Sequence, residues 1–149
     1  MIIAVTGHRS EDCEPESVVR DKLRAAFEDA KPEAVIVGMA NGVDLWAGSE
    51  ALRLGFDVIA ARPWATHAPR KDDAELYAFV INGASRVVNV DDAESYVGPW
   101  LYHKRNEWMV DNATHVLAYW SGKESGGTYA CLRYAMKTEK PIRNIYAQS

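Results

Sequence analysis

Short apolar runs alternate with segments of helical period along the whole chain. Six runs rich in Val, Ile and Ala have the length of strands, at residues 2–6, 34–38, 57–62, 86–90, 114–120 and 141–146. Most of them are continuous rather than alternating, which is typical of strands covered on both faces. The pattern therefore predicts a buried, mostly parallel sheet of about six strands.

Five segments between these runs repeat mostly apolar residues at helical spacing. The repeating positions are 19, 23, 27 and 30; 43, 47, 51 and 54; 77, 80, 81 and 84; 101, 105, 108, 109 and 112; and 128, 131, 132, 135 and 136. Pro15 and Gly55 stand where a helix start and a helix end favour these residues. Strands that alternate with helices predict an α/β fold, with one open, doubly wound domain over residues 1–149. Residues 91–100 have the least pattern and are predicted to form a surface loop or lid.

The composition fits one globular domain. The chain has 149 residues, of which 48% are hydrophobic and 10% aromatic, so a disordered chain is excluded. Its apolar runs are far shorter than the roughly 20 residues of a membrane span, and no basic leader precedes them. Cys13 and Cys131 can form no disulfide framework and have no metal-ligand spacing around them. We expect a cytoplasmic protein without a metal, a cofactor or a membrane contact.

The charge is uneven along the chain. The formal net charge is −4, which argues against a general nucleic-acid binder, because such proteins carry a basic footprint. Residues 1–97 contain 17 acidic and 10 basic residues, whereas residues 98–149 contain 4 acidic and 7 basic residues. The last third of the chain therefore permits a local anion site.

The loops that follow the strands are the candidate site, because ligands of open parallel sheets bind beyond the carboxyl ends of the strands. Gly7, His8 and Arg9 follow the first run. A glycine there lets the backbone turn tightly or approach a ligand, and Arg9 can pair with a phosphate or a carboxylate. The alternative is a plain turn with an exposed arginine.

The loop after the second run contains Gly38 and Gly42 and opens directly into a helix. These glycines allow the loop to approach a ligand closely, with its amides at the helix mouth as an anion or ribose site. Asp44 falls in the first helical turn. It either complements the helix dipole, or it accepts a ribose hydroxyl or orients a water; if it reaches the sugar, it is the candidate catalytic residue.

Arg105 and Asn106 lie in the fourth helical segment. Arg105 shares a stripe with apolar residues, where a charge is unfavourable unless it has a partner. Either its stem packs while its guanidinium reaches solvent, or the guanidinium turns into the crevice and holds an anion. We favour the second interpretation.

The sequence Ser125-Gly126-Gly127-Thr128 opens the last helical segment. Two glycines expose consecutive amides, Thr128 can cap the helix or bind an oxygen, and the amino end of a helix favours negative charge. No Gly-Lys-Ser/Thr follows the glycines, so this is not a Walker P-loop. Such caps also occur without ligands, so ligand binding and simple capping both stay open.

Three segments resemble sequence motifs of known families. GMANGVDLWAGSEALRLGFDVIA, residues 38–60, resembles the Gly-x-Ala-x-Gly-Ile-Asp-x-x-Ala motif of DprA and the strand after it. YHKRNEWMVDNATHVLAYWSG, residues 102–122, is similar to the DprA Arg-Asn segment and to the Arg-Lys-x-x-Met segment of LONELY GUY (LOG) proteins. SGGT, residues 125–128, falls where LOG proteins have Pro-Gly-Gly-x-Gly-Thr-x-x-Glu. Together these segments resemble the SLOG superfamily of DprA/Smf, LOG and YpsA-like proteins, and the opening TGHR looks closest to the YpsA-like branch.

The resemblance implies a Rossmann-like fold whose crevice binds nucleotides or phosphate-bearing nucleotide derivatives. Carried over by position, the ligand-binding residues would be Gly38, Gly42, Asp44, Arg105, Asn106 and residues 126–128. The LOG catalytic glutamate falls at Cys131, although cleavage of an N-glycosidic bond needs a carboxylate.

We therefore expect a ligand-binding or sensor-type SLOG protein. The alternatives are a LOG-like phosphoribohydrolase acting on nucleoside 5′-monophosphates and a DprA-like nucleic-acid-binding module. A nucleotide-like small molecule is the expected partner, nucleic acid is the less expected one, and a homo-oligomer would fit the superfamily.

Overall fold

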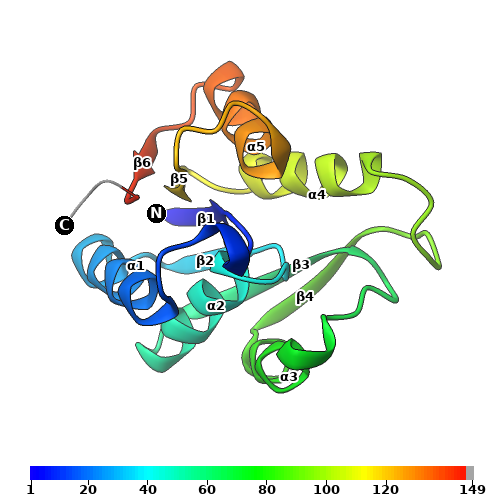
Figure 1. Ribbon diagram of the computed structural model, residues 1–149, viewed down its shortest axis with the longest axis horizontal. Helices are drawn as coiled ribbons and strands as arrows, with labels where there is room; N and C mark the ends of the chain where they lie inside the picture. Colours follow the sequence, from blue (N-terminus) through cyan, green and yellow to red (C-terminus); the bar gives the residue numbers. More distant parts are fainter. Residues whose placement is uncertain (147–149) are drawn as a thin grey trace.

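Residues 1–146, which the computed structural model describes, contain six parallel strands in one sheet (Figure 1). The strands are β1 (Ile2–Gly7), β2 (Ala34–Val37), β3 (Asp57–Trp64), β4 (Arg86–Asp91), β5 (His115–Tyr119) and β6 (Ile142–Asn144). Their order across the sheet is β4-β3-β2-β1-β5-β6. At the centre, Ala4 of β1 is in register with Ile36 of β2 and with Val116 of β5. The predicted mostly parallel sheet is therefore confirmed.

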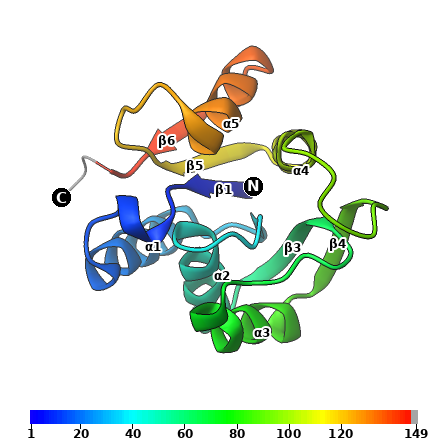
Figure 2. The same ribbon diagram turned by 45° about the vertical axis from the view of Figure 1, so that its right-hand side comes forward.

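Helices cover both faces of the sheet, as the views in Figures 1 and 2 show. One face carries α1 (Glu16–Ala30), α2 (Val43–Arg53) and α3 (Ala74–Gly83), and the other carries α4 (Trp100–Asp111) and α5 (Gly126–Lys137). Two short 3-10 turns, η1 (Ser10–Asp12) and η2 (Lys71–Asp73), precede α1 and α3. The chain is thus a doubly wound, Rossmann-like α/β domain. None of the helices in residues 1–146 is long and apolar enough to cross a membrane.

The predicted boundaries agree with the structure to within a few residues. Gly55 has a φ of +86° and donates its N–H to the Leu52 carbonyl at 3.0 Å, so it ends α2 as predicted. The last strand is shorter than the predicted run at residues 141–146, because the Asn144 side chain bonds both backbone groups of Trp120 and replaces the strand ladder there. Residues 92–99 form the loop predicted between β4 and α4.

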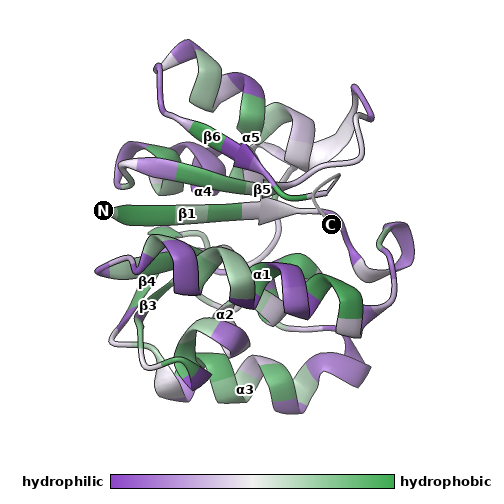
Figure 3. Ribbon diagram, turned by 90° about the vertical axis from the view of Figure 1, so that its left-hand side faces the viewer, coloured by the Kyte–Doolittle hydropathy of each residue, from purple (hydrophilic) through white to green (hydrophobic). Residues whose placement is uncertain are grey.

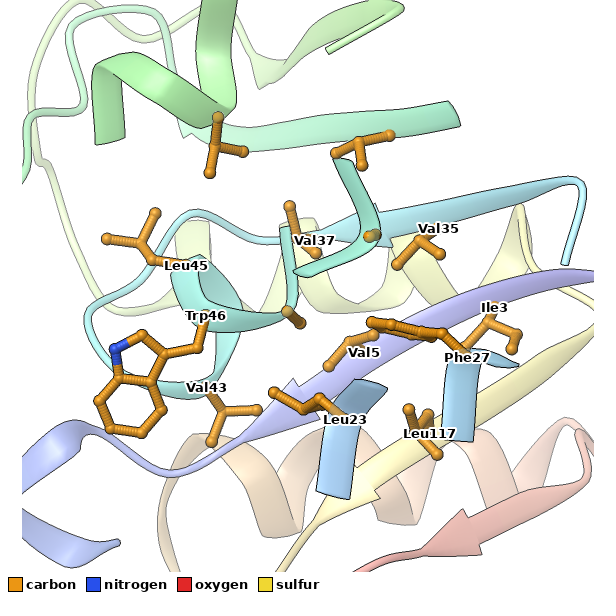
Figure 4. Close-up of a cluster of buried hydrophobic side chains, with 14 of the residues drawn as sticks. Ile3, Val5, Leu23, Phe27, Val35, Val37, Val43, Leu45, Trp46 and Leu117 are labelled. Carbon is orange, nitrogen blue, oxygen red and sulfur yellow. The ribbon is translucent and has the colours of Figure 1, made fainter. Parts of the chain in front are cut away.

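The continuous apolar runs are explained by burial on both faces. Ile3 and Val5 of β1 point toward Phe27 of α1 and Val43 of α2 in the larger core (Figure 4). Ala4, between them in sequence, points to the opposite face and packs in a smaller cluster with Met109 of α4. Figure 3 shows mostly hydrophobic central strands between helices in which hydrophobic and hydrophilic segments alternate. Alternate residues of one strand therefore need apolar partners on both sides of the sheet.

The chain changes direction across the sheet at β1 and β5. From β1 it continues through α1 to β2, and from β5 it continues through α5 to β6 on the other side. The loops that leave these two neighbouring strands diverge toward opposite faces, which opens a crevice at their carboxyl ends.

Candidate functional site

A cleft of about 730 Å³ lies at the carboxyl ends of β1 and β5. Its walls come from the end of β1, from the loops after β1, β2 and β5, and from the facing sides of α4 and α5. Most of the predicted site residues line it: Gly7, His8, Arg9, Asp44, Arg105, Asn106, Ser125, Gly126, Gly127 and Thr128. The fold therefore brings together residues from four separate segments of the sequence.

Gly38 and Gly42 do not line this cleft, although the sequence assigned both to ligand contact. A Cβ at Gly42 would lie 2.6 Å from the His8 carbonyl oxygen and the Ser10 amide nitrogen, and the φ of Gly42 is +89°. A Cβ at Gly38 would lie 2.9 Å from Arg105 Nη1 and from Asp44 Oδ2. The missing side chains of these glycines thus make room for other parts of the protein: the loop after β1 at Gly42, and Arg105 and Asp44 at Gly38.

Arg105 reaches the cleft from α4 and is only 6% exposed. Its Nη1 donates to the Gly38 carbonyl oxygen, and its Nε donates to Asn106 Oδ1 at 2.9 Å. The guanidinium lies 5.7 Å from the centre of the Tyr102 ring. Burial lowers the pKa of Arg105, and the nearby Asp44 carboxylate opposes that shift. The guanidinium therefore turns into the cleft and not out to bulk solvent.

Asp44 stands in the first turn of α2 and is 8% exposed. Its Oδ2 accepts the Ala40 N–H at 3.2 Å. Burial raises the pKa of this carboxyl to about 6, while Arg105, the Ala40 N–H and Arg9 act in the opposite direction. A carboxyl with a pKa this close to neutrality, at the wall of a cleft, can hold or accept a proton at physiological pH.

The amino end of α5 forms a further part of the cleft wall. Ser125 is the N-cap residue and makes no side-chain capping hydrogen bond. Gly126 has a φ of +88°, and a Cβ at Gly126 or Gly127 would meet no atom within 4 Å. Thr128 lies inside the first turn and is not the cap that the sequence allowed. Within residues 1–146 the first turn of α5 thus lines the cleft without a side-chain cap, and such a helix end favours an anion.

His8 also lines the cleft, but one of its nitrogens is already used by the protein. The Ser121 N–H donates to His8 Nε2 at 2.8 Å, which ties the loop after β1 to the loop after β5. Burial is the largest effect on the His8 ring and lowers its pKa. A neutral ring that accepts at Nε2 carries its proton on Nδ1. His8 therefore braces the two loops that form the crevice.

Sequence reasoning missed several residues of the cleft wall. Lys123, Arg133 and Tyr129 line it, as do Asp12 and Tyr102. Tyr129 and Arg133 follow the Gly126–Gly127 pair at helical spacing, so the period of α5 was the signal that could have found them.

No family model matches the chain. The uncharacterized SPbeta prophage-derived protein YoqJ of Bacillus subtilis is 33% identical over 76 residues. That alignment covers 45% of this chain and 44% of YoqJ, so it spans less than half of the relative's length.

Solved structures resemble the chain over almost its full length. DprA from Streptococcus pneumoniae has a TM-score of 0.77 at 19% identity and is matched over 94% of this chain and 48% of that one. DprA from Helicobacter pylori, whose structure describes a single-stranded DNA binding mode, has a TM-score of 0.73 at 17% identity, over 95% of this chain and 63% of that one. The structure of TM1055 has a TM-score of 0.63 at 20% identity, over 95% of this chain and 71% of that one. The chain has a SLOG-type fold.

At these identities the likeness establishes the SLOG fold alone, and this chain spans about half the length of the pneumococcal protein. Cys131, where the sequence resemblance predicted the LOG glutamate position, is 2% exposed and packs with Val110 and Leu132. Burial raises the pKa of its thiol to about 11. Cys131 is not among the described residues that line the cleft, whereas Asp44 is.

Proposed function

We propose that the protein binds a nucleotide, or a phosphate-bearing nucleotide derivative, in the cleft between β1 and β5. One observation carries this proposal: the buried Arg105 guanidinium and the uncapped amino end of α5 open onto the same cleft. A cation and a set of free amide dipoles that converge on one space favour an anion there. The volume of about 730 Å³ lies in the range of small-ligand sites.

The charges around the cleft support the same proposal. Arg9, Lys123 and Arg133 line it, and within residues 1–146 none of them forms an ion pair. The carboxylates in the wall are Asp12 and Asp44. Unneutralised cations at the rim raise the local concentration of anions and so favour the entry of a phosphate.

The geometry orients such a ligand. The phosphate would accept from the amides of Gly127 and Thr128 and from Arg105. The sugar would lie toward Ala40 and Asp44, which form the wall on the β2 side. This arrangement uses the free amides for the most charged part of the ligand and the carboxyl for hydroxyl groups.

The experiment uses two substitutions at one position. The Cβ of Gly127→Ala enters open space, so this variant keeps the fold and the amides. Gly127→Asp adds a carboxylate in the first turn, which suits the helix dipole but competes with a bound phosphate. In thermal-shift and calorimetric titrations with AMP and ADP-ribose, we expect wild type and Gly127→Ala to bind and Gly127→Asp to bind at least tenfold more weakly.

Arg105→Gln supplies a second test in the same titrations. We expect weaker binding, because the glutamine amide is uncharged and ends near the position of the Arg105 Nε, where it can still donate to Asn106 Oδ1. Circular dichroism checks that this variant is folded. Equal affinity of Gly127→Asp and Gly127→Ala for every phosphate compound would place the anion elsewhere and refute the proposal.

A second candidate function rests on Asp44. Its carboxyl lines the cleft, and burial raises its pKa to about 6, as a general acid or base near neutrality requires. It could assist hydrolysis of a nucleoside 5′-monophosphate, in which the C1′–N bond breaks, the water oxygen bonds to C1′ and the leaving base takes up a proton. Release of free base from a panel of monophosphates, abolished in Asp44→Asn, would establish this activity; stable monophosphates would exclude it.

A further inference from the structure

A second hollow, of about 490 Å³, runs between α4 and α5 and continues the cleft. Four residues line both: His103 and Asn106 on α4, and Ala130 and Arg133 on α5. Figure 1 shows α4 and α5 side by side on the same face of the sheet. A ligand whose first phosphate sits at the start of α5 therefore has an open path along this α4–α5 groove.

Arg133 stands at the junction and is held there by aromatic rings. Its guanidinium carbon lies 5.8 Å from the centre of the Tyr129 ring. That ring stacks on Trp120, with 6.1 Å between the ring centres and 16° between the planes. A guanidinium placed over an aromatic face is oriented without losing its charge. Within residues 1–146 no carboxylate pairs with Arg133.

Lys137 extends the cationic wall by one helical turn. It lines the groove, and it too forms no ion pair within residues 1–146. Glu107 is the acidic residue among those lining the groove. Arg133 and Lys137 face this one lining carboxylate, so the lining itself is net cationic, and Asp111 stands behind the lining Tyr134, from which it accepts at 2.8 Å.

The spacing along α5 decides which second anion fits. Side chains on a helix lean toward its amino end, so Lys137 reaches back to about the level of residue 133, while the Arg133 guanidinium lies nearer the cleft, over the Tyr129 ring. That level lies six residues beyond Gly127, which is about 9 Å along the helix axis. The two phosphates of a diphosphate are too close together to span this distance along the helix. Phosphates at opposite ends of a nucleoside can cover it.

We propose that the α4–α5 groove is a second anion subsite, formed by Arg133 and Lys137, for a small ligand with a second phosphate one nucleoside away from the first. The inference rests on the proposed function, because it places the first phosphate at the start of α5. A single cationic pair beside one carboxylate suits one further phosphate, whereas a nucleic-acid track needs cations that continue along the surface.

The experiment compares AMP, ADP and adenosine 3′,5′-bisphosphate by calorimetry on wild type, Lys137→Gln and Lys71→Gln. Lys71 is exposed in η2 and lines neither hollow, so its variant controls for net charge. We expect the bisphosphate to bind wild type and Lys71→Gln at least tenfold more tightly than AMP. In Lys137→Gln that advantage should fall to threefold or less, while the affinities for AMP and ADP stay within twofold.

The possible failures are distinct. A bisphosphate that binds no more tightly than AMP, or an advantage that Lys137→Gln retains, overturns the second subsite while AMP binding still supports the first. No binding of AMP to wild type contradicts the proposed function itself. The affinity is also measured for 5′-phosphorylated oligoadenylates of increasing length. An affinity that stops rising at the dinucleotide supports a small ligand. An affinity that keeps rising to the tetranucleotide, with a steeper salt dependence, makes the occupant nucleic acid and overturns the proposal.

Discussion

At the scale of single residues, the site depends on the pair Asp44 and Arg105 and on the absence of a side chain at Gly38. Both charged groups lie against the position where a Gly38 Cβ would stand, and both are more than nine-tenths buried. Burial disfavours the ionised form of each group, and the opposite charge of its partner favours it. Because the pKa of Asp44 is raised toward neutrality, the net charge of this pair changes with pH.

Asp44 should make anion binding depend on pH. Burial raises the pKa of this carboxyl to about 6, so it is charged at pH 7.5 and neutral at pH 5. A negative charge in the same cleft as the anion is lost on acidification, so the affinity should rise as the pH falls through 6. Sulfate is a suitable probe because it does not titrate in this range. In calorimetry we expect wild type to gain about tenfold in affinity between pH 7.5 and pH 5.

Asp44→Asn separates this effect from the other groups in the cleft. The variant should bind sulfate more tightly than wild type at pH 7.5 and about equally at pH 5. The histidines are common to both proteins, so the difference between the two pH profiles reports Asp44. Parallel profiles would show that its charge does not act on the bound anion.

At the scale of elements, α1 and α2 are joined by a charge cluster on the face away from the cleft. Glu50 of α2 is 1% exposed and accepts from Arg20 at 3.0 Å and from Arg24 at 3.1 Å. Arg20 also pairs with the exposed Glu16 on its own helix at 2.8 Å. The buried carboxylate therefore fixes how α2 packs on α1, and with it the position of Asp44 at the start of α2.

Glu50→Gln should destabilise the fold by about 2 kcal/mol, because two arginines lose a buried partner. The loss stays below that of a fully enclosed ion pair, since the Arg24 side chain is 42% exposed. Glu16→Gln is the matched control and should cost about 0.5 kcal/mol or less, as an exposed pair does. Urea unfolding measures both values, and equal losses in the two variants would contradict a special role of Glu50.

At the scale of the whole molecule, one sheet separates two layers of helices. The larger core lies under α1 and α2, and two smaller clusters lie under α4 and α5. Because each strand contributes residues to both faces, we expect the two layers to unfold together as one cooperative domain.

Phe27→Ala tests this cooperativity. Phe27 is fully buried in the larger core, so its truncation should cost about 3–5 kcal/mol. Val18→Ala, on the same helix at 37% exposure, should cost little. Native-state hydrogen exchange should show the same loss for the slowest amides of α1 and of α4 in Phe27→Ala. Unchanged opening free energies in α4 and α5 would mean that the layers unfold separately.

The sequence by itself determined the order and type of the elements, because hydrophobic period is a local property and each run is long enough to express it. It also located Gly126 and Gly127 at the start of a helix, since a glycine pair there leaves the first-turn amides without side chains beside them. It assigned Gly38 to ligand contact and could not predict that this glycine approaches Arg105, which stands 67 residues further along the chain. It also left Arg133 and Lys137 unnoticed as exposed helical cations. Only the packing of α5 against α4 placed those cations on a groove that meets the cleft, and that packing depends on contacts between residues far apart in the chain.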